Sequence, residues 1–137
     1  MKALALAAVV SMMVSPAAAA EPQRLQMAVG AHHFTVVLDD TSAAKALARM
    51  VPVTFEMSDL NDNEKKVRLP QGLPTNIVRP GTIRTGDVLL WGDDTLVVFY
   101  KTFSSPYSYT RIGRIENPGD LQKVLGPSDV RVTLTRP

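Results

Sequence analysis

The fold is decided by residues 88–100, which read VLLWGDDTLVVFY. Two apolar runs, 88–91 and 96–100, flank the turn sequence GDD at 92–94. Apolar residues occupy both alternating positions of each run, so both faces of the two strands should be buried. The stretch therefore predicts a β-hairpin at the centre of a sheet.

Strand patterns recur on both sides of this hairpin at short spacing. The clearest alternation lies at 51–58, where Val51, Val53, Phe55 and Met57 should face inward. The other segments with strand character are 25–29, 33–38, 67–69, 109–116 and 130–134. With the central hairpin they make about eight strands, a number and spacing typical of a barrel or a sandwich.

Two short helices complete the predicted elements. One covers 42–50 after the capping residues 39–41, and the other covers 118–125 with Asn117 as its cap. Three segments predict loops: a polar one at 59–66, a long proline- and glycine-rich one at 70–86, and one at 102–108. Only two helices are present, too few for a parallel α/β fold, so the chain should form one mainly β domain.

The first twenty residues predict a cleaved secretory signal peptide. Lys2 precedes an apolar run at 3–14, and Ala18-x-Ala20 before Glu21 fits a cleavage site. The run is too short and too rich in alanine to favour a stable membrane span. The mature domain would then be 21–137, located in the periplasm or secreted.

Composition excludes several function classes. Fifteen basic residues against thirteen acidic ones leave a net charge of +2, too small for a dedicated nucleic-acid binder. The chain has no cysteine, so disulfides, a thiol nucleophile and a lipid-bearing cysteine are excluded. It also lacks a phosphate-binding loop and a Gly-x-Ser-x-Gly elbow.

An aromatic cluster with one arginine is the strongest candidate for a binding site. Its members, within thirteen positions, are Phe99, Tyr100, Phe103, Tyr107, Tyr109 and Arg111. Aromatic rings beside an arginine suit a proline ring, a peptide backbone or a carboxylate. By alternation, Tyr107, Tyr109 and Arg111 share one face of a strand. The structural alternative is that the rings fill the barrel core and its mouth while Arg111 pairs with an acid.

Three further side chains are candidates for the same site. Asn76 and Arg79 in the loop 70–86 could contact a ligand at that mouth, or Arg79 could simply cap carbonyls. Trp91 is predicted to lie in the core rather than to form a ligand platform.

The sequence predicts neither a metal site nor a cofactor. Asp59-x-Asn61-x-Asn63 resembles the start of a calcium loop, but Glu64 stands where a glycine is required, which favours a solvated turn. The histidine pair at 32–33 would point to opposite faces of a strand and could not fill a tetrahedral site.

Several blocks of sequence resemble the small bacterial cyclophilin-like domain proteins, over nearly all of 25–126. These blocks are Met57-Ser58-Asp59, Asn63-Glu64-Lys65, Leu73-Pro74-Thr75, Gly81-Thr82-Ile83, Gly86-Asp87, Phe99-Tyr100 and Tyr107-Ser108-Tyr109-Thr110. The stretch Ile112-Gly113-Arg114-Ile115 also looks like the Phe-Gly-x-Val strand of true cyclophilins. The resemblance implies a compact β-barrel of about eight strands closed by two helices. The Phe-His-Arg-type motif that carries the catalytic arginine of prolyl isomerases is missing.

These observations predict an exported cyclophilin-like barrel that binds a peptide or a small anionic ligand. Arg111 would fix the polar group of the ligand, and Phe99, Tyr107 and Tyr109 would bury the rest. A weak prolyl isomerase is the enzymatic alternative, and a domain that docks onto another envelope protein is the second alternative. Fold alone cannot decide among them.

Overall fold

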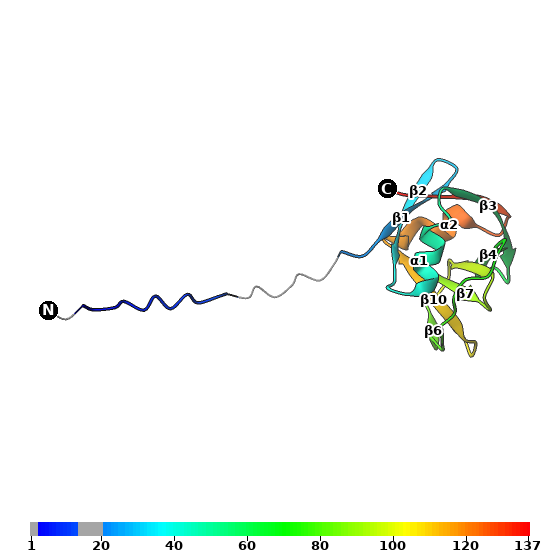
Figure 1. Cartoon of the computed structure of the whole chain (residues 1–137). Coiled ribbons are helices and arrows are strands. Elements are labelled where there is room, and N and C mark those ends of the chain that lie inside the picture. The colour runs from blue at the N-terminus through cyan, green and yellow to red at the C-terminus, as the bar shows by residue number, and fades with distance from the viewer. Residues whose placement is uncertain (1–2, 14–20) are drawn as a thin grey trace.

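The computed structural model describes residues 3–13 and 21–137 (Figure 1). Residues 3–13 form no helix or strand, are exposed, and lie apart from the folded domain. The predicted cleavage sequence at 18–20 lies outside the described residues, so the signal peptide stays a prediction. Among the described residues, no helix has the length and apolar character needed to cross a membrane.

Eight antiparallel strands close into a barrel, as the sequence predicts. They are β1 (Arg24–Val29), β2 (His32–Leu38), β3 (Val53–Leu60), β4 (Glu64–Arg68), β7 (Asp87–Trp91), β8 (Thr95–Phe99), β10 (Tyr109–Ile115) and β11 (Val130–Thr135). Their order is β2-β1-β11-β3-β4-β8-β7-β10, and pairing of β2 with β10 closes the ring. Closure leaves no open edge among these strands.

The central hairpin has the predicted register and burial. Val88 lies opposite Val98 and Leu90 opposite Leu96, and these four side chains belong to the barrel core. The alternate residues Leu89, Val97 and Phe99 are also buried, but in a second cluster on the outer face. Both faces are therefore covered, which explains the continuous apolar pattern.

Closure of the barrel requires a glycine where β10 meets β2. A Cβ atom at Gly113 would lie 2.3 Å from the carbonyl oxygen of Val37, closer than any side chain tolerates. The pairing of β10 with β7 shifts register between Arg111 and Gly113, as in a β-bulge.

Both helices pack on the barrel core. In α1 (Ser42–Ala48), the Thr41 hydroxyl accepts a hydrogen bond from the Ala44 amide at 3.1 Å. A 3-10 turn, η1 (Pro118–Asp120), leads into α2 (Leu121–Leu125), whose two end leucines are buried. The predicted Asn117 cap is wrong: its backbone is left-handed, whereas a capping residue needs an extended conformation.

The barrel interior is filled. Alternate residues of the strands meet inside, among them Leu25, Met27, Phe55 and Leu134. The remaining cavity between them has a volume of about 10 Å³, no more than about one water-sized probe. The interior therefore has no room for a ligand.

The predicted polar loop at 59–66 is wrong. Strand β3 runs to Leu60 and β4 starts at Glu64, so only three residues turn the chain. Asn61 and Asp62 both have positive φ, a conformation that short Asn and Asp side chains tolerate better than most. The segment looks polar because the hairpin carries charged residues at positions that are buried.

Short strands lie within the two other predicted loops. In 70–86, β5 (Ile77–Val78) pairs with β10 and β6 (Thr82–Ile83) pairs with β9 (Phe103–Ser104) of 102–108. The β6–β9 pair forms an arm beside the outer face of β7, β8 and β10.

Candidate functional site

The outer face of the barrel wall carries a second, smaller apolar cluster. Its buried members are Ile83, Leu89, Val97, Phe99 and Tyr109, and Phe103 packs against them. They come from β6–β9 and from the outward positions of β7, β8 and β10. The arm covers one end of this face and leaves the rest open.

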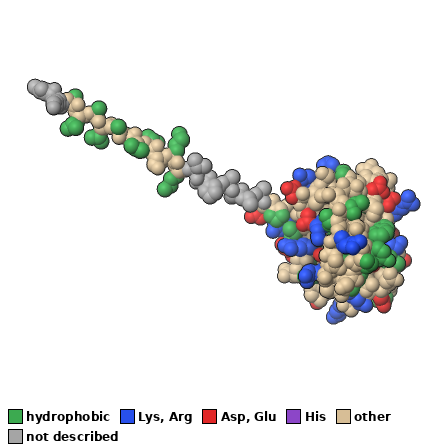
Figure 2. Space-filling view, turned by 90° about the horizontal axis from the view of Figure 1, so that it is seen from below, with side chains coloured by type: hydrophobic (Ala, Val, Ile, Leu, Met, Phe, Trp, Pro, Cys, Tyr) green, Lys and Arg blue, Asp and Glu red, His purple; other side chains and the backbone are tan. Residues whose placement is uncertain are grey.

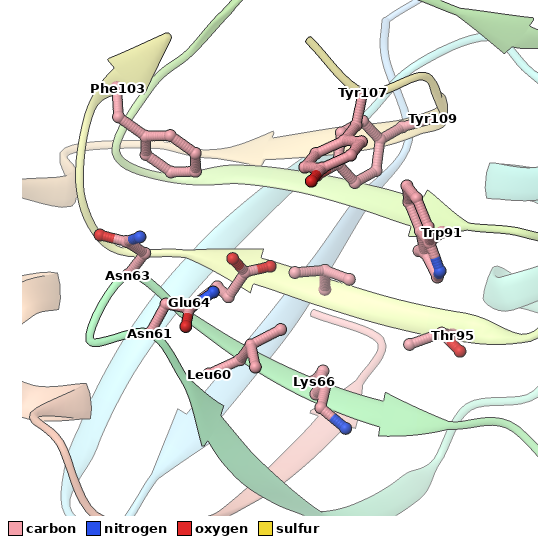
Figure 3. A pocket seen from close by; sticks show the side chains of 11 residues that line it. Leu60, Asn61, Asn63, Glu64, Lys66, Trp91, Thr95, Phe103, Tyr107 and Tyr109 are labelled. Carbon is pink, nitrogen blue, oxygen red and sulfur yellow. The ribbon is translucent and has the colours of Figure 1, made fainter. Parts of the chain in front are cut away.

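A hollow of about 560 Å³ lies on the open part (Figure 3), within the size range typical of small-molecule sites. It is lined by Leu60, Asn61, Asn63, Glu64, Lys66, Trp91, Thr95, Val97, Phe103, Tyr107 and Tyr109. Apart from Thr95 on β8, the polar side chains come from β4 and the β3–β4 turn, and the rings come from β7, β9, β10 and the segment between the last two. One side of the hollow is therefore charged and polar, and the other is aromatic.

The aromatic side is a corner of mutually tilted rings. The centroid of Trp91 lies 5.5 Å from that of Tyr107, with an interplanar angle of 85°, and 5.5 Å from that of Tyr109, at 60°. Phe99 lies beneath, edge to face with Tyr109. Edge-to-face contacts hold the rings and leave ring faces free for a ligand.

The prediction that Trp91 lies in the core is wrong. Its side chain is 46% exposed because it ends β7 on an outward position, opposite Thr95 and beyond the cover of the arm. Tyr107 is 56% exposed. Two large rings thus remain accessible at one hollow.

Glu64 lies between the polar and aromatic sides (Figure 3). The residue is only 8% exposed, and no described residue donates a hydrogen bond or an ion pair to its carboxyl group. Burial, together with the nearby negative charge of Asp59, raises the pKa of Glu64 to about 7, although Lys66 acts in the opposite direction. The hollow therefore contains a carboxyl group that has no protein partner and gains or loses its proton near neutral pH.

The neighbouring Lys65 points to the inner face and is completely paired. Its Nζ donates to Asp59 Oδ1 at 2.8 Å and to the carbonyl oxygens of Gly126 and Ser128 at 2.5 and 2.6 Å. The Tyr100 hydroxyl donates to the same Asp59 oxygen at 2.6 Å. This network ties β3 and β4 to the segment after α2.

The network fixes Asp59 as a carboxylate. Burial alone would raise its pKa, but hydrogen bonds from Lys65, Tyr100 and the Asp62 amide outweigh burial and lower it. Burial and the hydrogen bond to Asp59 raise the pKa of Tyr100. One oxygen of Asp59 is thus held by two side chains and the other by the Asp62 amide, which matches the predicted turn rather than a calcium loop.

The structure brings together only some of the predicted site residues. Tyr107 and Tyr109 line the hollow, and Phe99 supports it from beneath. The alternative that the rings fill the barrel core and mouth holds only for Tyr100, because the strand positions of the other rings point outward. Tyr100 alone of the cluster belongs to the barrel core.

The predicted polar residues lie elsewhere. Arg111 is exposed and does not line the hollow, and no described residue forms an ion pair with it. Asn76 lines a separate hollow of about 220 Å³ beside the start of α1, where its backbone N–H donates to the Thr110 hydroxyl at 3.0 Å. Arg79 is exposed and lines neither hollow. The loop 70–86 therefore does not bring its polar groups to the rings.

Sequence reasoning missed Glu64, Lys66 and the β3–β4 turn as lining residues. A signal was present: extending the strand at 67–69 backwards with a period of two places Lys65 inward and Glu64 and Lys66 outward. The polar composition of 59–66 concealed that period.

The part of the chain that the structure describes holds no group of three His, Asp or Glu side chains placed to bind a metal. His32 and His33 lie on β2, both exposed, and a ring nitrogen of His33 is 3.2 Å from the Gln26 amide nitrogen.

Comparisons with known proteins agree with this architecture. A family model described as the Cyclophilin-like family matches residues 27–135. The solution structure of a hypothetical protein from Archaeoglobus fulgidus is similar, with a TM-score of 0.57 and 20% identity over 85% of this chain and 96% of that one. At that identity the likeness concerns the fold alone. No match to this chain is found among curated proteins. The family match runs from within β1 to the end of β11, and the chain belongs to the Cyclophilin-like family.

Proposed function

We propose that this protein is a binding module that holds a peptide segment or a small ligand in the hollow on its outer wall. The observation that carries the proposal is the exposure of two large rings, Trp91 and Tyr107, at a concave site that also contains an unpartnered carboxyl group. Large exposed aromatic rings are costly to leave in water, and binding sites use them to bury ligand surface.

The chemistry of the lining favours binding over catalysis of prolyl isomerisation. The isomerase alternative requires an arginine beside an apolar pocket, and no arginine lines this hollow. Docking onto a large partner requires a broad apolar patch. On the face shown in Figure 2, basic and acidic side chains are scattered over the surface, and apolar side chains gather in one limited group. The concave hollow therefore favours binding of a small or extended ligand over docking of a large partner with a flat surface.

We further propose that the domain acts after export, in the periplasm or outside the cell. The support is the sequence pattern of residues 1–20, and the folded domain begins only at β1. Expression of the full chain followed by sequencing of the mature N-terminus tests this: cleavage before Glu21 is expected, and retention of Met1 on a cytoplasmic protein would contradict it.

Binding can be followed without a label, because Trp91 is the single tryptophan of the chain and lines the site. A library of end-blocked tripeptides should include members that change its fluorescence saturably. Tyr107→Ala should weaken that binding about tenfold, the loss of roughly 1.4 kcal/mol expected for one aromatic contact. Ile77→Ala removes an equally exposed apolar side chain outside the lining and should leave binding unchanged. Equal effects of both substitutions would contradict the proposed site.

A further inference from the structure

We propose that the hollow recognises a cation, and that its ligand carries an ammonium group placed between the rings of Trp91, Tyr107 and Tyr109 with Glu64 as its counter-ion. This inference rests on the proposed function and names the chemical class of the ligand. It reverses the sign of charge that Arg111 suggested, because that arginine does not line the hollow.

The rings supply the first part of such a site. Trp91 is nearly perpendicular to Tyr107 and steeply tilted to Tyr109, so the three do not stack on one another. In Figure 3 the indole is seen nearly edge-on, with one face turned toward the side of the hollow where Glu64 lies. Ring faces carry negative electrostatic potential, and cages of this kind attract ammonium groups.

Glu64 supplies the second part. Only 8% of the residue is exposed, its carboxyl group is aimed at the rings, and no described residue donates a hydrogen bond to it, so its oxygens are reached by water from the hollow. A carboxylate that is largely withdrawn from water and has no protein partner is unfavourable, and such groups are ordinarily paired. A ligand ammonium would provide the positive charge and the hydrogen-bond donors that no described residue supplies to Glu64.

The other charges around Glu64 explain why the protein itself does not fill this role. Asp59 is held by Lys65 and Tyr100, so it adds negative potential without providing a donor. Lys66, on the same face of β4, lines the hollow but forms no ion pair with Glu64. In Figure 3 its ammonium points away from the rings. Lys66 therefore lies at the edge of the hollow. Its positive charge weakens the attraction of cations to the hollow, but it does not occupy the space beside the three rings.

Three probes of nearly equal shape test the inference on the full mature chain: the Nα-acetyl amides of lysine, norleucine and glutamate. Norleucine keeps the aliphatic stem of lysine without its charge. We expect the lysine derivative to quench Trp91 and to bind at least about tenfold more tightly than the norleucine derivative, a difference of one strong cation–π contact with its counter-ion. The glutamate derivative should bind most weakly.

Two matched substitutions on β4 locate the charge. Glu64→Gln is isosteric and should lower the affinity for the lysine derivative about tenfold. It should have little effect on the affinity for the norleucine derivative, which carries no charge. Lys66→Gln should raise the affinity for the lysine derivative, since a repelling charge is removed. Circular dichroism of each variant verifies that the barrel is intact.

The outcomes separate this inference from the proposed function. If the norleucine or glutamate derivative binds as tightly as the lysine derivative, and Tyr107→Ala weakens that binding, the hollow is a ligand site but not a cation site. The same holds if Glu64→Gln leaves the lysine affinity unchanged. If none of these probes and no tripeptide of the library affects Trp91, both the inference and the proposed function fail.

Discussion

Glu64 and Lys65 are adjacent on β4, both are charged and both are buried, yet the protein treats them in opposite ways. Lys65 faces inward, is fully buried, and has three oxygen partners around its ammonium group. Glu64 faces outward and has none among the described residues. A buried charge that is fully paired is compatible with a structural role, whereas one left unpaired costs stability.

The two residues stand for the two faces of the same wall. On the inner face only about 10 Å³ of cavity remains, and Lys65 stabilises the fold there. The outer face leaves about 560 Å³ open beside exposed rings. Along the same strands, inward residues stabilise the fold and outward residues form the proposed binding site. Substitutions of inward residues should therefore change stability, and substitutions of outward residues should change binding.

The largest expected effect is on the inner face. Lys65→Met keeps much of the side-chain volume but removes the positive charge beside Asp59 and leaves two carbonyl oxygens without the donor they share. We expect a loss of about 3–5 kcal/mol in the free energy of unfolding, as for removal of one partner of a buried ion pair. Urea unfolding measures it. Lys66→Met, on the half-buried outer position, should change stability by only about 0.5 kcal/mol. Similar losses in both variants would refute the division between the faces.

Glu64→Gln should stabilise the protein, in contrast to Lys65→Met, and the gain in the free energy of unfolding should depend on pH. The folded protein holds the Glu64 proton up to about pH 7, whereas an unfolded glutamate releases it near its ordinary value of 4.5. The unfolded state therefore binds fewer protons between these values, and wild-type stability should fall as pH rises through that window and then level off.

Glutamine has no charge to bury, so the variant should escape this loss. It should exceed the wild type by about 1–2 kcal/mol above the window, a range reduced for the open side of the hollow, and match it near the lower end. Urea unfolding across the window checks the difference. A constant difference at every pH would show that Glu64 does not titrate as proposed.

A smaller loss is expected for Tyr100→Phe. The substitution removes the hydroxyl that donates to Asp59 but keeps the ring in the barrel core, and a loss of about 1.5–2 kcal/mol is typical for one hydrogen bond to a charged group. Tyr107→Phe is the matched control, since no described residue bonds to the Tyr107 hydroxyl. Thermal unfolding should lower the midpoint of the first variant and leave the second unchanged.

The smallest effect on stability is expected at Tyr107, an exposed ring of the proposed binding site. Tyr107→Ala truncates a ring that is mostly exposed and should cost about 0.5 kcal/mol or less in unfolding free energy. Phe99→Ala, on a fully buried ring of the same cluster, should cost about 3–5 kcal/mol. If Tyr107→Ala unfolds the domain, the outer rings belong to the core and the binding proposal loses its main support.

Much of the fold could be predicted because its signals are local. The period of two at 51–58 placed Val51, Phe55 and Met57 inward, and the apolar hairpin at 88–100 proved to be covered on both faces. The errors fell at charged hairpins and at Asn117, where composition resembles a loop or a cap but the backbone conformation decides otherwise.

The site was predictable only in part. Alternation indicated that Tyr107 and Tyr109 share a face, and they do line one hollow. Arg111 followed the same alternation but lies beyond it, next to the register shift of β10, and Asn76 lies at the start of α1 on the other side. Contacts between segments far apart in sequence carry no local signal.

The sequence by itself determined a single mainly β domain with about eight strands, its single tryptophan and its absence of cysteine chemistry, while the closed barrel was implied by the family resemblance. These follow from composition and from the periodicity of each strand, which neighbouring residues impose. Only the tertiary structure decided that Glu64 lacks a partner while Lys65 has three, and that Trp91 is accessible. Whether a side chain finds a partner depends on which strands close next to it and where the covering arm ends, and no single strand encodes that.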